Sequence, residues 1–143
     1  IMDVCTRIKD TIALTALLTC ILRMLFRLRT RNQRWRLYTP MLIRENRWRA
    51  MRYSFDEGLI DLARGKVVPF AELMDELCSL VAEDARALGC EKEIKGIHDI
   101  LTRGTSAHRQ LKTYELERAS GASDEESLKS VVDTLIADTA AGL

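Results

Sequence analysis

The stretch IALTALLTCILRMLFRL, residues 12–28, decides the fold of this sequence. Its leucines and isoleucines recur at spacings of three and four residues, which predicts a helix with a buried apolar stripe. The expected members of that stripe are Leu14, Leu17, Leu18, Ile21, Leu22, Leu25 and Leu28. Asp10, just upstream, is the expected N-cap. The helix is nearly apolar on all sides as far as Arg23, so we expect it to occupy a central position in the fold.

The longest apolar run within this helix, residues 12–22, is about half of a membrane span, and arginines follow it. A lipid-crossing helix needs roughly 20 such residues, so we predict a buried helix and no membrane association. The N-terminus has neither the charged region nor the cleavage site of a signal peptide. Because the chain begins with Ile1 rather than Met, we expect it to be a fragment of a longer protein.

Composition and charge bound the remaining possibilities. The 143 residues, 47% of them hydrophobic, correspond to one domain or part of one over residues 1–143. The net charge is only +1, but residues 1–53 carry 12 basic and three acidic groups, whereas the remainder carries 10 basic and 18 acidic groups. The four cysteines form no C-x-x-C pair, which favours a reduced, cytoplasmic protein without a zinc site.

Capping residues, prolines and glycines divide the rest of the chain into elements. Thr39 and Pro40 predict a second helix as far as Tyr53, and Pro69 predicts a third that ends before Gly89. Further helices are expected over residues 91–103, 105–119 and from 123 onward, where Ser123 and Glu126 form a capping box. Residues 59–62 and 66–68 predict a short β hairpin or two extended pieces. The fold class is therefore mainly α, with about six helices plus the hairpin.

Two segments combine tryptophan with arginine: residues 32–36, NQRWR, and residues 45–53, ENRWRAMRY. An arginine is a planar fork of donors that matches phosphate or carboxylate, and tryptophan offers it a stacking face. This chemistry favours an anion-binding site. In the alternative interpretation these arginines pair with the acidic second half while Trp35 and Trp48 fill the core. A third interpretation is single-stranded nucleic-acid binding, although no known nucleic-acid motif is present.

Other motifs for chemistry are absent from the sequence. His98 and His108 lie ten residues apart without acidic neighbours at ligand spacing, so no metal site is expected on them. No glycine-rich phosphate loop occurs either.

Several blocks together resemble the C-terminal part of glutamate–cysteine ligase family 2, the YbdK-like carboxylate–amine ligases. The resemblance spans nearly the whole chain, and its most specific block is the E-N-[KR]-W-R-A core at residues 45–50. The other blocks are residues 1–6, 10–14, 32–38, 51–53, 59–61, 88–90 and 104–110. The pattern of the family has glycine after Arg-Tyr, where this chain has Ser54.

The resemblance implies an ATP- and Mg²⁺-dependent ligase that joins glutamate or another carboxylate to cysteine or another amine through an acyl-phosphate. Such an enzyme forms γ-glutamylcysteine, in glutathione biosynthesis. The implied fold is an α+β, glutamine synthetase-like catalytic domain with an antiparallel sheet, of which this chain is the helical C-terminal portion. Most of that sheet and the metal ligands would precede Ile1, so the chain alone is expected to be inactive.

The resemblance also suggests site residues. Arg47 and Arg49 are the catalytic candidates, and Asp3, Asn46 and Arg52 are candidates for binding substrate or nucleotide, with no metal ligand among them. Under this interpretation the partners are small-molecule substrates, with no nucleic acid. A homo-oligomer is one expectation. The other is that an N-terminal portion, where it exists as a separate or cleaved chain, associates through the exposed face of the long first helix. The alternative is a non-catalytic helical module that binds an acidic partner or single-stranded nucleic acid through its basic half.

Overall fold

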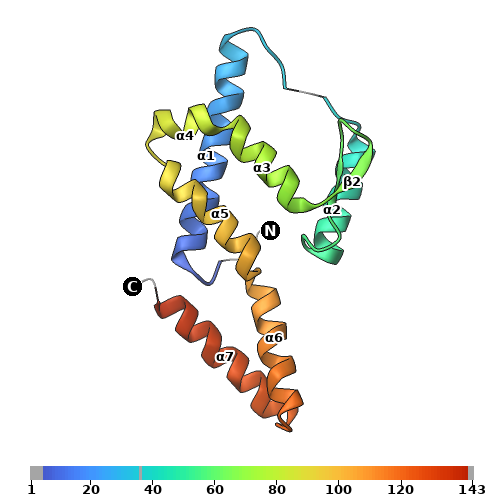
Figure 1. Cartoon of the computed structure of the whole chain (residues 1–143), viewed down its shortest axis with the longest axis vertical. Helices are drawn as coiled ribbons and strands as arrows, with labels where there is room; N and C mark the ends of the chain where they lie inside the picture. The colour runs from blue at the N-terminus through green and yellow to red at the C-terminus, as the bar shows by residue number, and fades with distance from the viewer. Residues whose placement is uncertain (1–4, 36, 142–143) are drawn as a thin grey trace. The chain divides into compact units, whose positions relative to one another are not determined.

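The computed structural model describes residues 5–35 and 37–141 (Figure 1). Within these residues the fold is mainly α with one two-stranded antiparallel sheet, as the sequence predicts. The chain divides into two compact units. The terminal unit combines Ile1–Ala16 with Cys90–Leu143, and the central unit is Leu17–Gly89. The candidate site residue Asp3 lies outside the described residues.

Helix α1 (Ile8–Thr30) is the long apolar helix that the sequence predicts. It begins two residues before Asp10, so Asp10 lies in its first turn and the N-cap prediction is wrong. The expected stripe is also largely wrong. Of its seven members only Leu17 is buried, whereas Leu18 and Leu22 are 50% and 67% exposed. The side of α1 that is buried carries Ala13, Leu17, Cys20 and Met24.

The physical reason is that α1 is apolar on every side. Leucine spacing then identifies a helix but cannot tell which of its faces has a neighbour. The small side chains of Ala13 and Cys20 let other segments approach closely, and they are 1% and 0% exposed. In the terminal unit a Cβ placed on Gly96 would lie 3.1 Å from the Cβ of Ala13, which shows how closely α1 and α5 (Glu91–Arg103) pack.

In the central unit, α2 (Pro40–Tyr53) is followed by the hairpin of β1 (Leu59–Asp61) and β2 (Lys66–Val68). The hairpin pairs Leu59 with Val68 and Asp61 with Lys66. The Asp61 carboxylate accepts hydrogen bonds from the backbone N–H groups of Ala63 and Arg64, which fixes the turn. Both the helix bounds and the hairpin agree with the sequence prediction.

The helix expected from Pro69 to Leu88 is two helices, α3 (Phe70–Leu80) and α4 (Ala82–Leu88). They meet at Val81, which is fully buried and has φ −93° and ψ 3°. Helix α4 ends at Gly89 with φ 68°, the left-handed stop that the sequence predicts.

A buried carboxylate ties α4 to α1 inside the central unit. Asp84, with 0% exposure, accepts hydrogen bonds from Arg27 Nε at 3.2 Å and Nη2 at 2.8 Å, and also from Arg23. The hydrogen bonds from Arg27 and Arg23 outweigh burial and hold the pKa of Asp84 below its ordinary value. Arg23 and Arg27 lie outside the two tryptophan–arginine segments, so this cluster does not bear on the interpretation in which the arginines of those segments pair with the acidic second half.

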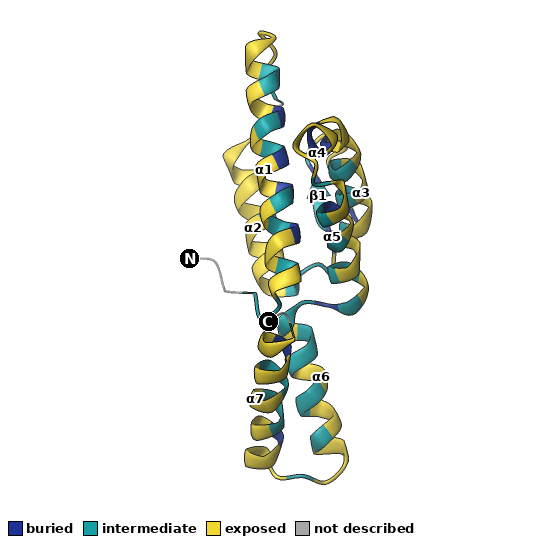
Figure 2. Ribbon diagram, turned by 90° about the vertical axis from the view of Figure 1, so that its left-hand side faces the viewer, coloured by how far each residue is buried: buried dark blue, intermediate teal, exposed yellow. Residues whose placement is uncertain are grey.

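The terminal unit contains the helical hairpin of α6 (Ser106–Ala119) and α7 (Asp124–Ala140), which lie side by side (Figures 1 and 2). Both helices begin with capping boxes. Thr105 and His108 exchange hydrogen bonds at the start of α6, and Ser123 and Glu126 do so at the start of α7. The capping box predicted at Ser123 is thus confirmed.

Candidate functional site

Helix α2 carries four of the five residues nominated from the sequence. Pro40 occupies its first turn, after Thr39 in an extended conformation, so the helix starts where the missing proline N–H costs nothing. No residue of α2 is buried. The 3.6-residue period places the nominated residues on two different faces, which the side-chain contacts distinguish.

The inner face of α2 contacts the hairpin through Asn46 and Arg49. The Asn46 side chain donates to the carbonyl oxygen of Ile60 at 2.8 Å and accepts from the Ile60 N–H at 2.7 Å, so it pairs with β1 much as a neighbouring strand would. Arg49 donates to the carbonyl oxygens of Glu57 at 2.9 Å and Gly58 at 3.3 Å. These bonds use both side chains to position α2 against the turn and β1.

The outer face of α2 bears the exposed cations. Arg47 and Arg52 are exposed, and neither bonds to another described residue through its side chain. Arg44 lies on the same face at i, i+3 from Arg47 and is equally exposed, although the sequence analysis did not nominate it. The exposed apolar residues Trp48 and Met51 lie among these arginines. The signal that could have found Arg44 is its helical spacing from Arg47.

Aromatic contacts connect this outer face to the rest of α2. The rings of Trp48 and Tyr53 meet edge to face with centroids 5.6 Å apart, and the Arg49 guanidinium lies 5.8 Å from the centre of the Tyr53 ring. Asn46, Arg49 and Tyr53 thus form one stripe along α2. It serves packing against the hairpin, while Arg44, Arg47 and Arg52 remain available to a ligand.

A second aromatic pair lines a cavity of about 200 Å³ in the central unit. Trp35 and Tyr38, from the segment between α1 and α2, are half-buried there beside Asn46. The remaining lining is mostly apolar with two carboxylates: Ile60, Asp61, Leu62, Leu73, Glu76, Leu77 and Leu80. Trp35 is therefore half-buried and Trp48 is exposed, so neither tryptophan fills the core as the alternative interpretation expects. Its neighbour Arg36 lies outside the described residues.

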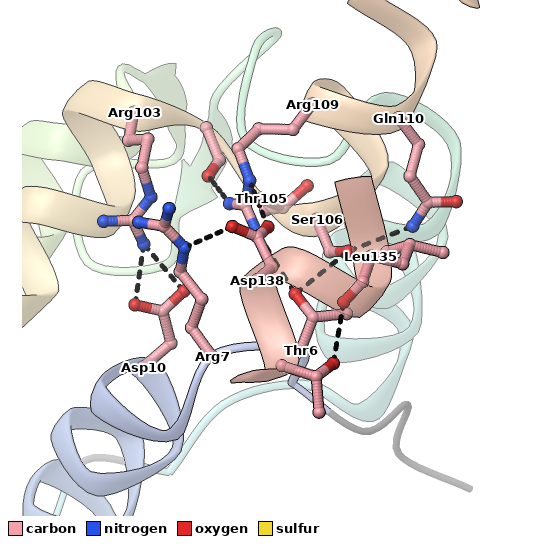
Figure 3. A network of polar contacts seen from close by, with 12 residues as sticks. Thr6, Arg7, Asp10, Arg103, Thr105, Ser106, Arg109, Gln110, Leu135 and Asp138 are labelled. Carbon is pink, nitrogen blue, oxygen red and sulfur yellow. Dashed lines mark hydrogen bonds and ion pairs between the residues drawn. The ribbon is translucent and has the colours of Figure 1, made fainter. Parts of the chain in front are cut away.

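The terminal unit holds a separate polar network that the sequence analysis missed (Figure 3). Asp138 accepts from Arg7 Nε at 2.8 Å and from Arg109 Nη2 at 2.7 Å, and Arg109 also donates to the carbonyl oxygen of Gly104. Arg103 binds both carboxylate oxygens of Asp10, at 2.6 and 2.7 Å. More than 90 residues separate the partners Arg103 and Asp10, so no local pattern could reveal the pair.

The charges of this network largely offset one another, because three arginines share two carboxylates. Burial alone would raise the pKa of Asp138, but the hydrogen bonds from Arg7 and Arg109 outweigh it and hold that pKa below its ordinary value. The adjoining cavity of about 170 Å³ is lined by three basic and three acidic side chains: Arg7, Lys9, Asp10, Asp99, Arg103 and Asp138. We therefore assign the network to holding α1, α5, α6 and α7 together.

No solved structure matches this chain. The sequence profile that describes glutamate–cysteine ligase family 2 matches residues 1–134. The chain belongs to glutamate–cysteine ligase family 2. The resemblance inferred from the sequence blocks is thereby confirmed.

Curated relatives with the provisional name glutamate–cysteine ligase 2 match almost the whole chain. The relative from Rhodospirillum rubrum is 54% identical over 143 residues, that from Jannaschia 50% over 138, and that from Paracoccus denitrificans 41% over 136. These alignments cover 100%, 96% and 95% of this chain but 37%, 36% and 36% of the relatives. The family member described here thus corresponds to the C-terminal part of its relatives.

Proposed function

We propose that this chain is the C-terminal part of an ATP-dependent carboxylate–amine ligase that joins glutamate to cysteine. In this reaction the carboxylate attacks the terminal phosphoryl group of ATP and releases ADP, and the amine then displaces phosphate from the acyl-phosphate. Membership of glutamate–cysteine ligase family 2 supports the reaction class. The observation that carries the role of this chain is the outer face of α2, where guanidinium groups stand unpaired among the described residues.

In the proposed ligase, Arg47 and Arg52 bind the phosphate or carboxylate oxygens of the substrates. Guanidinium groups suit this task because they stay charged and offer paired donors to an oxyanion. Asn46 and Arg49 act as positioning residues, since their hydrogen bonds to Ile60, Glu57 and Gly58 hold α2 against the hairpin. Asp3, which lies outside the described residues, remains a candidate for substrate binding.

The metal requirement falls on the rest of the protein. Among residues 5–35 and 37–141, no group of three or more His, Cys, Asp or Glu side chains is placed to hold a metal ion. We therefore assign no step of the reaction in this chain to Mg²⁺. The four cysteines, which form no C-x-x-C pair, support a cytoplasmic location for the proposed enzyme.

The test uses a chimera in which this chain replaces the C-terminal part of the Rhodospirillum rubrum relative, a replacement supported by 54% identity. ADP release is measured with ATP, Mg²⁺, glutamate and cysteine. We expect release that requires both amino acids, and a loss of about 100-fold in kcat/KM for Arg47→Ala or Arg52→Ala, since one charge-assisted donor contributes about 3 kcal/mol.

The matched control is Arg31→Ala, which removes an exposed arginine at the end of α1. It should leave ADP release unchanged. No release dependent on the amino acids would contradict the proposal. Tight binding of a single-stranded oligonucleotide that weakens steeply with salt would instead favour the non-catalytic module.

A further inference from the structure

Helix α1 has an apolar face that no described residue covers. Leu18, Leu22 and Phe26, spaced four residues apart, form what we call the outer stripe of α1. Their exposed fractions are 50%, 67% and 68%. The opposite side, with Leu17, Cys20 and Met24, is buried, and Figure 2 shows the two sides of α1 in different colours.

Such a helix is unusual on a protein surface. A helix exposed to water normally places polar residues opposite its buried side, whereas a helix that is apolar all round is buried on both sides. Three large aliphatic or aromatic side chains side by side also make a contiguous apolar patch, which typically marks an interaction site. The sequence of α1 therefore suits a partner on the outer stripe.

The curated relatives are long enough to contain a further portion that could be such a partner. The chain accounts for 37% of the Rhodospirillum rubrum relative and corresponds to its C-terminal part, so nearly two thirds of that protein precedes it. The alignment with that relative begins at residue 1 of this chain, seven residues before α1 begins at Ile8, so the polypeptide that precedes the match in that relative is attached close to the equivalent of α1. Attachment so close to α1 keeps the local concentration of that polypeptide high, which favours its packing there.

We infer that the outer stripe of α1, Leu18, Leu22 and Phe26, is the docking surface for an apolar surface of the N-terminal portion of this protein. This inference goes beyond the proposed activity and does not depend on it, because association is measured without substrates.

A lipid bilayer is the less suitable occupant. By length and composition α1 could cross a membrane, and 28% of its most apolar stretch is buried within the structure. However, Arg23 and Arg27 on the same helix are bound to the buried Asp84. A spanning α1 would carry this ion cluster toward the hydrocarbon region, where charged groups are costly.

The experiment co-expresses the tagged chain with the polypeptide that precedes the matching part of the Rhodospirillum rubrum relative. Co-purification and native mass spectrometry report a one-to-one complex. Leu22→Glu and Phe26→Glu would each bury a carboxylate in the apolar contact, so we expect the affinity to fall by at least about tenfold. Leu116→Glu is the matched control, because Leu116 is 62% exposed but lies on α6.

Each variant alone should keep the helical content and urea midpoint of the original chain, because the substituted side chains are exposed. The inference would be overturned by absence of the complex, by equal affinity of the α1 variants, or by an equal loss with Leu116→Glu. It would also be overturned if the same α1 variants abolished a homodimer of this chain or its binding to phosphatidylcholine vesicles. None of these outcomes bears on ADP release by the chimera.

Discussion

Ser54 ends α2 in a backbone conformation that favours glycine. Its φ is 54° and its ψ is −121°, a backbone conformation that a residue with a Cβ adopts only under strain. The pattern of glutamate–cysteine ligase family 2 has glycine at this place, and the turn that follows brings Glu57 and Gly58 to Arg49. The departure noted in the sequence thus has a local physical cost.

Replacing Ser54 by glycine should therefore stabilise the protein. The strain energy that glycine relieves in the folded backbone exceeds the entropy cost of its greater freedom in the unfolded chain. Ser54→Gly is therefore expected to raise the free energy of unfolding by about 1 kcal/mol. Urea unfolding followed by circular dichroism measures it. Ser54→Ala is the matched control, because alanine keeps the Cβ and should bring no gain. Equal stability of the two variants would show that the backbone at residue 54 is not strained.

At the scale of elements, the ion cluster on Asp84 fastens α4 to α1. Because the folded pKa of Asp84 lies below its unfolded value, its stabilising effect is present above the unfolded pKa of about 3.9. That effect is lost as the pH falls through the lower, folded pKa, since protonation then favours the unfolded chain. The cluster is thus a source of stability at neutral pH and not in acid.

Asp84→Asn should lower the free energy of unfolding by about 3 kcal/mol at pH 7, because two arginines lose their buried partner. The difference from the original chain should shrink when urea unfolding is repeated near pH 3. Glu83→Gln serves as the control. The Glu83 side chain is 57% exposed, and its Oε2 lies 3.2 Å from Arg27 Nη1. Removing this exposed charge should change the free energy of unfolding little. A difference of the same size at both pH values would exclude the ionised carboxylate as the cause.

Elements marked by local signals are the ones that the sequence predicts well. Pro40 starts α2, Gly89 stops α4, and Ser123 with Glu126 caps α7, all within one turn of the element concerned. What the sequence could not predict are features that depend on distant partners. The bonds from Arg23 and Arg27 to Asp84 cross about 60 residues, and the buried side of α1 depends on the neighbours of that helix.

The candidate site shows the same division. The segment of residues 45–53 could be nominated because its residue types suit anion binding, and four nominated residues are indeed on α2. The separation of these four residues into an inner and an outer face could not be predicted from the sequence, because it depends on the pairing of Asn46 with Ile60 in the hairpin. That pairing is why Arg47 and Arg52, rather than Arg49, are left for a ligand.

At the scale of the whole molecule, the two compact units each have an ion cluster of their own. Asp84 receives Arg23 and Arg27 within Leu17–Gly89, whereas Asp138 receives Arg7 and Arg109 within the terminal unit. Interactions confined to one unit stabilise that unit first, and local opening of a protein follows such cooperative groups. The units should therefore respond separately to the loss of their clusters.

Hydrogen exchange at neutral pH tests this separation. Asp138→Asn should speed exchange of backbone amides in α6 and α7, since it removes the carboxylate that α7 presents to Arg7 and Arg109. Amides of β1, β2 and α3 should keep their rates. Asp84→Asn is the reciprocal control, with faster exchange in α3 and α4 and little change in α6 and α7. If either variant sped exchange equally in both units, the chain would open as one cooperative body, and the division into units would have no energetic meaning.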